Sequence, residues 1–303
     1  MLPGLHGKTV VVTGANAGVG YFTSEQLASA GAHVVLACRN EARADAAAAA
    51  IRGRVPGARV EFLKLDTSDL DSVAAAARVI NGLERVDALV ENAGMVHPPA
   101  SRSTDGRGNE LVLSTNLLGH FALTAQTLPA LMRTPSARVV MLGSLISRLY
   151  DFRIGDLQLR AHYSPMRAYA HSKIGMQSFG FELDRRLRHA GADVAGLVAH
   201  PGYSIGGLTV RVPGVNEPTA SKRIVDALQS PMAQSKRKGA WSVVRAVADD
   251  AAVGGEYYGP RFLTRGRPVV QTPTHTSVDP EIAEELWLKA EEYTGVSFDV
   301  PVT

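Results

Sequence analysis

The strongest constraint on the fold is a regular alternation of short apolar runs with helix-like stretches. Runs rich in β-branched residues occur at 9–12, 33–37, 59–63, 88–90, 138–142 and 194–199. Each is nearly continuously apolar, which is typical of strands that are covered on both faces. Stretches with helix-compatible apolar spacing separate them, at 19–30, 41–52, 70–83, 109–132 and 167–190. The alternation predicts an α/β fold with a doubly wound parallel sheet and helices on both faces.

The rhythm changes after residue 202. Residues 203–218 are rich in Gly and Pro, and helix-like segments follow at 221–229, 233–247 and 280–294, with a last strand after Gly254-Gly255. No linker separates two cores, so residues 1–303 are expected to form a single domain. Within it we expect a substrate lid at about 203–235 and a C-terminal tail at about 261–303.

Capping residues mark the ends of several predicted helices. Asp66, Thr67 and Ser68 offer N-cap groups for the third helix. Gly31 and Gly191 lie where helix C-caps are expected.

Composition excludes several classes of protein. A chain of 303 residues with 45% hydrophobic positions can bury a core unaided, and its one cysteine excludes a disulfide framework or a multi-cysteine metal centre. No His, Asp or Glu cluster has metal-ligand spacing, so no metal is expected. Lys and Arg (32) nearly balance Asp and Glu (29), which argues against a nucleic acid partner. Without a signal-like or membrane-spanning stretch, the protein is expected to be soluble, cytoplasmic and free of the membrane.

A glycine-rich turn, TGANAGVG at 13–20, joins the first strand to the first helix. Glycines allow a tight turn and a close approach of pyrophosphate, and the helix N-terminus favours the anion. In this βαβ context the turn indicates dinucleotide binding rather than an ordinary connection.

The end of the second strand indicates which dinucleotide binds. Residues 37–40 are Ala-Cys-Arg-Asn, with no acid to hold the ribose 2′-hydroxyl of NAD. Arg39 is placed for a bidentate contact with the 2′-phosphate of NADP, which is therefore favoured; the alternative is a solvated surface arginine. Cys38 is expected to be a small buried side chain rather than a reactive thiol.

Tyr169 and Lys173 lie four residues apart in a predicted helix, one turn apart on the same face. A tyrosine needs a nearby cation to stabilise its phenolate and lower its pKa before it can serve as an acid–base near neutral pH. The spacing also arises by chance, so the pair gains its meaning from its place after the fifth strand of a dinucleotide fold.

Several motifs in this order make the chain resemble the short-chain dehydrogenase/reductase family over nearly its whole length, with the Rossmann-type fold of that family. They are TGANAGVG, ACRN, Asp66, ENAG at 91–94, TNLLGHF at 115–121, Ser144, YAHSK at 169–173 and HPG at 200–202. NLLGHF, DFRIGDLQ at 151–158, HPGYS and GGEYYGP at 254–260 are similar to the retinol-dehydrogenase-like branch and its bacterial relatives.

The resemblance implies four catalytic residues. Tyr169 would be the acid–base, and Lys173 would lower its pKa and bind the nicotinamide ribose. Ser144 would polarise the substrate oxygen, unless it only caps a strand end. Asn116 would bend its helix and hold a water that relays protons to Lys173.

The resemblance also implies a set of cofactor contacts. Asp66 would contact the adenine, although a simple capping role is an equal alternative. The histidines His162, His171 and His200 are expected to pack or hydrogen-bond rather than bind a ligand. The expected cofactor-binding residues are Gly14, Asn16, Gly18, Val19, Gly20, Arg39, Asp66, Thr67, Asn92, Gly94, Tyr169, Lys173, Pro201, Gly202 and Ser204.

Two positions depart from the family pattern. Glu91 stands where the family often has Asn, and we expect an altered hydrogen bond in the sheet without loss of activity. Gly206, followed by Gly207, stands where related sequences commonly carry a Thr that contacts the nicotinamide carboxamide. Ser204 or a backbone N–H would substitute, or the loop would order only with substrate. The two glycines favour a mobile lid, in which NADPH plus substrate alters the protease sensitivity of residues 203–215.

The expected function is NADP(H)-dependent interconversion of a carbonyl and an alcohol on a small lipophilic substrate, with reduction as the cellular direction. Apolar residues expected to shape the pocket, unless half of them belong to the core, are Leu145, Ile146, Leu149, Tyr150, Tyr163, Met166, Tyr203, Ile205 and Leu208.

Two alternative functions and the assembly also need to be considered. The first alternative is a dinucleotide-binding regulatory or scaffold protein with vestigial catalysis. The four catalytic residues argue against it, and Gly206 slightly favours it. A serine hydrolase is opposed by Ser144, which lies in LGSLI rather than in a G-x-S-x-G turn. A homodimer or homotetramer through 109–132 and 167–190 is the default assembly, and a monomer stays open.

Overall fold

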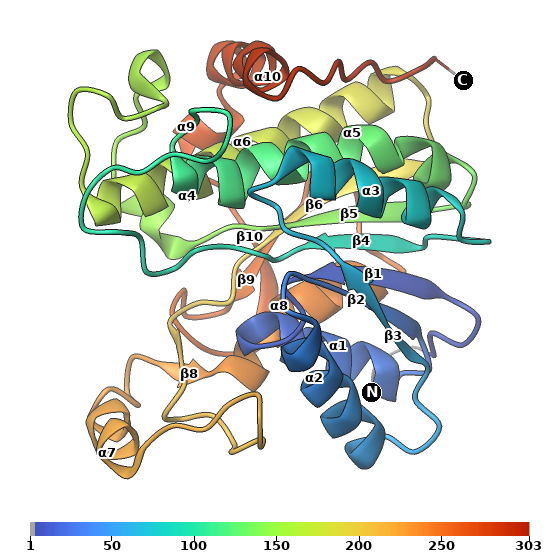
Figure 1. Cartoon of the computed structure of the whole chain (residues 1–303), viewed down its shortest axis with the longest axis vertical. Coiled ribbons are helices and arrows are strands. Elements are labelled where there is room, and N and C mark those ends of the chain that lie inside the picture. Colours follow the sequence, from blue (N-terminus) through green and yellow to red (C-terminus); the bar gives the residue numbers. More distant parts are fainter. Residues whose placement is uncertain (1–3, 303) are drawn as a thin grey trace.

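The computed structural model describes residues 4–302 and confirms the doubly wound sheet between two helical layers (Figure 1). Eight strands lie in the order β10-β9-β6-β5-β4-β1-β2-β3, and all neighbours are parallel except β10, which runs antiparallel to β9. The strands are β1 Thr9–Thr13, β2 His33–Cys38, β3 Val60–Lys64, β4 Ala88–Glu91, β5 Ala137–Leu142, β6 Val194–Ala199, β9 Tyr257–Pro260 and β10 Pro268–Gln271.

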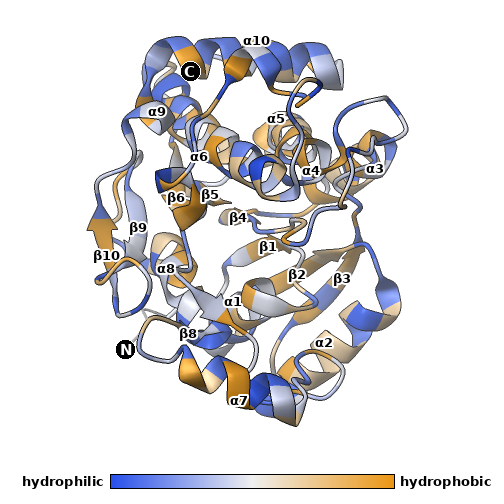
Figure 2. Ribbon diagram, turned by 90° about the vertical axis from the view of Figure 1, so that its left-hand side faces the viewer, coloured by the Kyte–Doolittle hydropathy of each residue, from blue (hydrophilic) through white to orange (hydrophobic). Residues whose placement is uncertain are grey.

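Each face of the sheet has its own hydrophobic core. One core joins the sheet to α3 (Leu70–Asn81), α5 (Gly119–Met132), α6 (Pro165–His189) and α10 (Pro280–Thr294). The other joins it to α1 (Gly18–Ser29), α2 (Glu41–Arg54) and α8 (Lys236–Ala248). Figure 2 shows the hydrophobic colour on strands such as β1 and β2, and much of the hydrophilic colour on the outward side of α10. The predicted strands are largely apolar because both faces are covered, except at the sheet edge, where β3 has the exposed residues Glu61 and Lys64.

The C-terminal helix covers two helices that the sequence assigned to oligomer contacts. Trp287 of α10 and Phe298 beyond it pack against Phe121 of α5 and Phe179 of α6, with ring centroids 5.2–6.3 Å apart. The Arg186 guanidinium lies 4.1 Å from the Trp287 ring centroid. The exposed side of α5 and α6 is therefore partly occupied by the chain itself.

The predicted helix over 109–132 is interrupted. It consists of a short α4 (Leu111–Leu113), a π-helical turn at Ser114–Leu118 and then α5. A π-turn inserts one residue into the helical ladder and turns the following side chains, a device that is common at functional sites.

The predicted cap of α3 is wrong by one residue. Asp69, which directly precedes the first helical residue, accepts hydrogen bonds from the N–H groups of Asp71 (3.0 Å) and Ser72 (3.4 Å). Asp66 instead binds Ser68 in the turn before the helix. Gly31 and Gly191 follow the ends of α1 and α6 with φ of +97° and +72°, as the C-terminal positions of helices require.

The region after β6 contains elements that the sequence did not predict. Residues 234–235 do not begin a helix: β8 (Gln234–Ser235) pairs with β7 (Ser204–Ile205), and Ser235 then caps α8. The helix α7 (Ala220–Leu228) lies between them, as expected. The edge strand β10 and the single-turn helix α9 (His275–Val278) were missed because each is short and β10 begins with a proline.

The Asp69 cap makes a prediction for stability. Replacing Asp69 with Ala should lower the free energy of unfolding by about 1 kcal/mol, because two amide groups of α3 lose their acceptor. Asp45→Ala, on the exposed side of α2, is the matched control and should be nearly neutral. Urea denaturation of the two variants measures the difference, and equal destabilisation would contradict the cap.

Candidate active site

The predicted site residues gather at the carboxyl ends of the parallel strands. This edge is where α/β sheets bind ligands, because the connections to the following helices leave side chains and N–H groups there. The residues that directly follow successive strands are Gly14 after β1, Arg39 after β2, Asn92 after β4 and Pro201 shortly after β6, with Asp66 and Ser144 two residues beyond β3 and β5.

The glycine loop, residues 13–20, packs closely against the end of β4 at Gly14 and has open space next to Gly18. Gly14 has a φ of +64°, and a Cβ on it would lie 2.8 Å from the Cα of Ala93. Gly18 has a φ of +60°, and no atom lies within 4 Å of its would-be Cβ. The helix α1 begins at Gly18 without a side-chain cap and without an acidic residue in its first turn. Its first N–H groups are thus available to an anion.

Asn92 ties the end of β4 to this loop. Its Nδ2 donates to the main-chain oxygens of Thr13 (2.7 Å) and Gly14 (3.3 Å). In return, the Thr13 hydroxyl accepts from the N–H groups of Asn92 (2.9 Å) and Ala93 (2.8 Å). A Cβ on Gly20 would clash with the Asn92 amide, so the loop, β4 and α1 fit together at this point.

Arg39 and Asp66 meet at the edge of the site. The Arg39 side chain is 73% exposed, and its Nη1 lies 3.6 Å from Asp66 Oδ2. Ser68 donates to Asp66 Oδ1 from its N–H (3.0 Å) and its hydroxyl (2.7 Å). An exposed ion pair of this length contributes little to stability, so the guanidinium can bind a more highly charged anion such as a phosphate. Thr67 is buried, and its main chain packs directly against Gly119.

Ser144, Tyr169 and Lys173 come together as predicted. The Tyr169 hydroxyl lies 3.4 Å from Ser144 Oγ, and Lys173 Nζ donates to the Leu142 carbonyl at 2.7 Å. Tyr169 and Lys173 come from α6, whereas Ser144 and Leu142 come from the end of β5. Gln177, one turn beyond Lys173, donates to the Ser144 carbonyl at 3.0 Å and fixes the turn that carries the serine.

The pKa of Tyr169 is raised, whereas the spacing to Lys173 predicts a lowering, because burial dominates. Burial raises the pKa of the Tyr169 phenol, and only its hydrogen bond with Ser144 opposes that rise. Burial lowers the pKa of Lys173 to about 8. The Lys173 ammonium donates its hydrogen bond to the Leu142 carbonyl. The phenol is consequently protonated at neutral pH.

Asn116 lies in the π-turn, and its amide is fully engaged. Its Oδ1 accepts from the Met95 N–H at 2.6 Å, and its Nδ2 donates to Ser172 Oγ at 2.9 Å. A Cβ on Gly94 would lie 3.1 Å from that Oδ1, so a larger residue would crowd the Asn116 amide. The predicted bend of the helix at Asn116 is thus present as the π-turn.

His120 is a site residue that the sequence reasoning missed. It is fully buried, with Nε2 3.0 Å from Thr13 Oγ1 and Nδ1 3.1 Å from the Asn116 carbonyl. Because the Thr13 hydroxyl already accepts two N–H groups, its own hydrogen goes to Nε2, and Nδ1–H donates to Asn116. Burial lowers the pKa of His120 to about 4, so the ring is neutral. The available signal was its position one turn after Asn116 in TNLLGHF.

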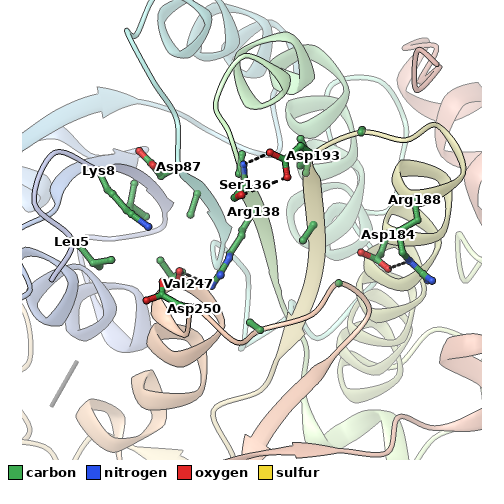
Figure 3. A pocket seen from close by; sticks show the side chains of 18 residues that line it. Leu5, Lys8, Asp87, Ser136, Arg138, Asp184, Arg188, Asp193, Val247 and Asp250 are labelled. Atoms are coloured by element: carbon green, nitrogen blue, oxygen red, sulfur yellow. Dashed lines mark hydrogen bonds and ion pairs between the residues drawn. The ribbon is translucent and has the colours of Figure 1, made fainter. Parts of the chain in front are cut away.

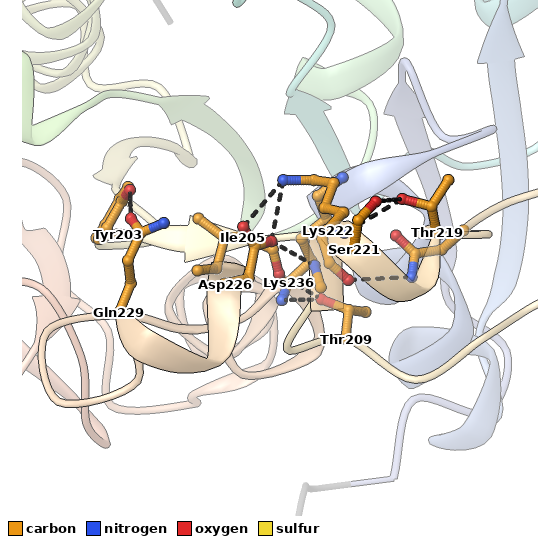
Figure 4. A network of polar contacts seen from close by, with 12 residues as sticks. Tyr203, Ile205, Thr209, Thr219, Ser221, Lys222, Asp226, Gln229 and Lys236 are labelled. Atoms are coloured by element: carbon orange, nitrogen blue, oxygen red, sulfur yellow. Dashed lines mark hydrogen bonds and ion pairs between the residues drawn. The ribbon is translucent and has the colours of Figure 1, made fainter. Parts of the chain in front are cut away.

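The loop after β6 is held by a polar network (Figure 4). The Gly207 N–H donates to Asp226 at 2.7 Å, and Asp226 also pairs with Lys222 at 3.0 Å. A Cβ on Gly207 would lie 2.6 Å from the Asp226 Cβ, so this glycine permits close packing against α7. Ser204 Oγ donates to the Pro201 carbonyl at 2.7 Å, which commits its hydrogen within the loop.

None of the nine apolar side chains expected to shape the pocket is buried. The alternative that half of them belong to the core is therefore wrong. The half-buried ones are Leu145, Ile146, Tyr150, Tyr163, Ile205 and Leu208, and the exposed ones are Leu149, Met166 and Tyr203.

The other singled-out residues have packing or hydrogen-bonding roles. His171 packs on Phe152 with ring centroids 5.3 Å apart, and His200 lies between the Gly202 N–H and Gln271. His162 is exposed. Cys38 is 1% exposed, and burial raises the pKa of its thiol to about 11. Among residues 4–302, no three His, Cys, Asp or Glu side chains are grouped to hold a metal ion.

A cavity of about 510 Å³ lies at the opposite, amino end of the strands (Figure 3). Several of its charged side chains already have partners. Arg138 donates to the Val247 carbonyl at 3.0 Å, Arg188 pairs with Asp184 at 2.7 Å, and Asp193 accepts from the Ser136 N–H at 2.8 Å. This cavity lies at the other end of the strands from the Ser144–Tyr169 group.

Comparisons with known proteins bear on this geometry. Residues 8–211 match the family model described as short chain dehydrogenase. Human retinol dehydrogenase 13 is 34% identical over 96% of this chain and 85% of its own length. Mouse polyprenol dehydrogenase is 34% identical over 97% of this chain and 86% of its own length.

Solved structures agree on the fold. An uncharacterised protein from Mycobacterium Paratuberculosis is 33% identical, with a TM-score of 0.79 over 99% of this chain and 97% of its own. A short chain dehydrogenase from Burkholderia cenocepacia, solved in complex with NADP, is 24% identical, with a TM-score of 0.63 over 84% of this chain and 96% of its own. No helix within residues 4–302 has the length and apolar character needed to span a bilayer.

The glycine loop and the Ser144–Tyr169–Lys173 group now have a family context. Relatives that match almost the whole chain are named retinol dehydrogenase and polyprenol dehydrogenase, and the family match shows that the protein is an oxidoreductase that acts on alcohols or carbonyls. The chain belongs to the short chain dehydrogenase family, in its retinol-dehydrogenase-like branch.

Proposed function

We propose that the protein transfers a hydride between NADP(H) and the carbonyl or alcohol carbon of a lipophilic substrate, with Tyr169 as the acid–base. One observation carries the proposal. A protonated phenol lies 3.4 Å from the Ser144 hydroxyl, one helical turn from a buried lysine, at the same sheet edge as an open glycine loop.

The residues present fit a dinucleotide. The uncapped start of α1, at Gly18 and Val19, would receive the pyrophosphate, with Gly14, Asn16 and Gly20 shaping the turn. On the far side, Asn92, Gly94, Pro201, Gly202 and Ser204 would border the nicotinamide half. When bound, the cofactor supplies the hydride, and the protein orients the substrate and moves the proton.

Arg39 supports NADP over NAD. Its guanidinium is 73% exposed and carries a single long ion pair, so it can take a phosphate in bidentate fashion. Asp66, held by Ser68, would keep that guanidinium pointed along the edge of the site while Asp66 and Thr67 border the adenine. The Burkholderia cenocepacia relative contains NADP, which agrees with this choice.

In the reduction direction, two hydroxyl groups would donate to the substrate oxygen. Ser144 would polarise the carbonyl, and Tyr169 would deliver the proton as the oxygen gains charge. Burial raises the pKa of the phenol, which suits an acid more than a base and favours reduction. Lys173, an ammonium ion at neutral pH, would stabilise the phenolate left behind and bind the nicotinamide ribose.

Asn116 would support this chemistry by position. Its amide holds Ser172 at 2.9 Å, and Ser172 in turn donates to the Tyr169 carbonyl at 2.8 Å. A water that relays protons to Lys173 would bind the Asn116 main-chain oxygen, because the amide is engaged and His120 occupies only one of the two carbonyl lone pairs.

The substrate would be a lipophilic alcohol or aldehyde. Apolar side chains that are not buried, among them Leu145, Ile146 and Leu208, lie between β5 and α6 and in the loop after β6. The relatives are named for retinol and polyprenol, both alcohols with long hydrocarbon bodies. Residues 203–235 would form the lid of a single domain, fixed at one end by the pairing of β7 with β8.

The position of the C-terminal helix α10 bears on the oligomeric state. Because α10 and Phe298 cover parts of α5 and α6, a homo-oligomer through those helices would have to displace or include them. We therefore favour a monomer over the dimer or tetramer.

Tyr169→Phe tests the acid–base role. The variant should oxidise NADPH about 10²- to 10⁴-fold more slowly with a panel of lipophilic aldehydes and ketones, because the proton donor is lost while the ring remains. Absorbance at 340 nm measures turnover, and fluorescence titration should show that NADPH still binds. Tyr293→Phe, on the half-buried side of α10, is the matched control and should turn over normally. Tight NADPH binding by the unaltered protein with no turnover across the panel would favour the scaffold alternative.

Arg39→Asp tests the cofactor choice. Loss of the phosphate contact and gain of a carboxylate should lower the NADPH-over-NADH ratio of kcat/KM by about tenfold or more, since a charge-assisted hydrogen bond is worth about 1.5–3 kcal/mol. Arg43→Asp makes the same charge change on the exposed side of α2 and should leave the ratio unchanged. If Arg39→Asp keeps the preference for NADPH, the assignment of Arg39 is wrong.

A further inference from the structure

Glu91 stands where the family often has Asn, and the reaction described above gives it no role. It ends β4 and is fully buried. The Thr124 hydroxyl of α5 donates to its Oε1, while Oε2 has no hydrogen-bond partner within the described residues. A buried carboxylate with an unpartnered oxygen is costly unless a nearby charge balances it.

Lys173 is a buried cation at the end of the neighbouring strand. Lys173 is 3% exposed, and its Nζ donates to the Leu142 carbonyl. Glu91 is in register with Met141 on the neighbouring strand, and Leu142 follows Met141. The carboxyl group and the ammonium group therefore both lie at the carboxyl ends of the neighbouring strands β4 and β5.

Each of the two charges acts on the other. Burial raises the pKa of Glu91 to about 8, opposed by the Thr124 hydrogen bond and the Lys173 cation. Burial lowers the pKa of Lys173 to about 8, opposed by the Glu91 carboxylate. Two groups that titrate in one range and influence each other lose their protons as a pair.

The other titratable groups that face this pair keep one charge state. His120 of α5 stays neutral because burial lowers its pKa to about 4. Tyr169 of α6 stays protonated because burial raises its pKa. The remaining neighbours from β1, β5 and the π-turn are Thr13, Met141, Leu142 and Asn116, which carry no charge.

We propose that Glu91 is a positioning residue for the reaction: its buried carboxyl group, once ionised, is the counter-charge that keeps Lys173 an ammonium ion as the pH rises. It thereby sets the upper end of the pH range in which Lys173 can stabilise the phenolate and hold the ribose. The part played by Lys173 rests on the proposed function, whereas the Glu91–Lys173 pair is a property of the protein alone.

Glu91→Gln removes the charge and keeps the shape and an acceptor for Thr124. Burial then lowers the pKa of Lys173 without opposition, so Lys173 should lose its proton at a pH about one unit lower. Glu25→Gln is the matched control. Glu25 is 4% exposed, also has an oxygen without a hydrogen-bond partner, and pairs with Arg54 at 3.7 Å on the opposite helical layer.

The titration of Lys173 tests the pair without cofactor or substrate. The chain has seven lysines, so the ε-carbon NMR signals of ¹³C-labelled lysine are few, and Lys173→Arg identifies the signal of Lys173. Between pH 6 and 10, the midpoint should fall by about one unit in Glu91→Gln and stay unchanged in Glu25→Gln. An unchanged midpoint in Glu91→Gln would overturn the proposal.

The pH profile tests the link to the reaction. The alkaline limb of kcat for NADPH-dependent reduction should move to lower pH in Glu91→Gln, in step with the NMR midpoint, while KM for the carbonyl substrate at pH 6 stays unchanged. Glu91→Asp, which restores the charge, should return the limb toward its original pH. A limb that does not follow the NMR midpoint would overturn the positioning role. If the unaltered protein reduces no carbonyl compound, the proposed function is wrong. The NMR midpoint alone then tests whether Glu91 raises the pKa of Lys173.

Discussion

A buried chain of hydrogen bonds that starts at the Thr13 hydroxyl joins the two halves of the site. Thr13 binds the end of β4 through Asn92 and Ala93 and donates to His120. The hydrogen bonds continue from His120 to the Asn116 carbonyl. The Asn116 amide then donates to the Ser172 hydroxyl, which donates to the Tyr169 carbonyl. The glycine loop and the helix that carries Tyr169 and Lys173 are thus held in one geometry. Such a network is strong only when every member is satisfied, and here the order of donors leaves His120 neutral.

The arrangement of the strands positions this series of hydrogen bonds, and burial determines the charge states of the side chains around it. Parallel strands place β1, β4 and β5 side by side, so their carboxyl ends deliver Thr13, Glu91 and Ser144 to one edge. Taking Tyr169, Lys173, Glu91 and His120 out of water raises or lowers each pKa toward the neutral form. The phenol is left as a proton donor, while burial brings the pKa values of Glu91 and Lys173 close together, each to about 8.

Local patterns in the sequence predicted much of this arrangement. The apolar runs and helical spacing located six strands and the main helices because both signals depend on neighbouring residues. The order of the motifs along the sequence indicated Ser144, Tyr169 and Lys173 as candidate catalytic residues. His120 was missed because its partner Thr13 lies 107 residues away, a relation that no local pattern contains. For the same reason, Glu91 was noticed as a departure without its link to Lys173, and the expectation of a mobile lid at Gly206 and Gly207 did not include the close approach of Gly207 to Asp226.

The central claim is that a hydride passes from NADPH to a substrate carbon while Tyr169 delivers a proton to the oxygen. Reduction of a lipophilic aldehyde with NADPH that carries deuterium at the transferable position of C4, followed by mass spectrometry of the product, tests it directly. The account predicts one deuterium on the carbinol carbon of the alcohol, and none on that carbon when the label is in the solvent instead. Product alcohol without deuterium from the cofactor, or with carbon-bound deuterium from the solvent, would contradict it.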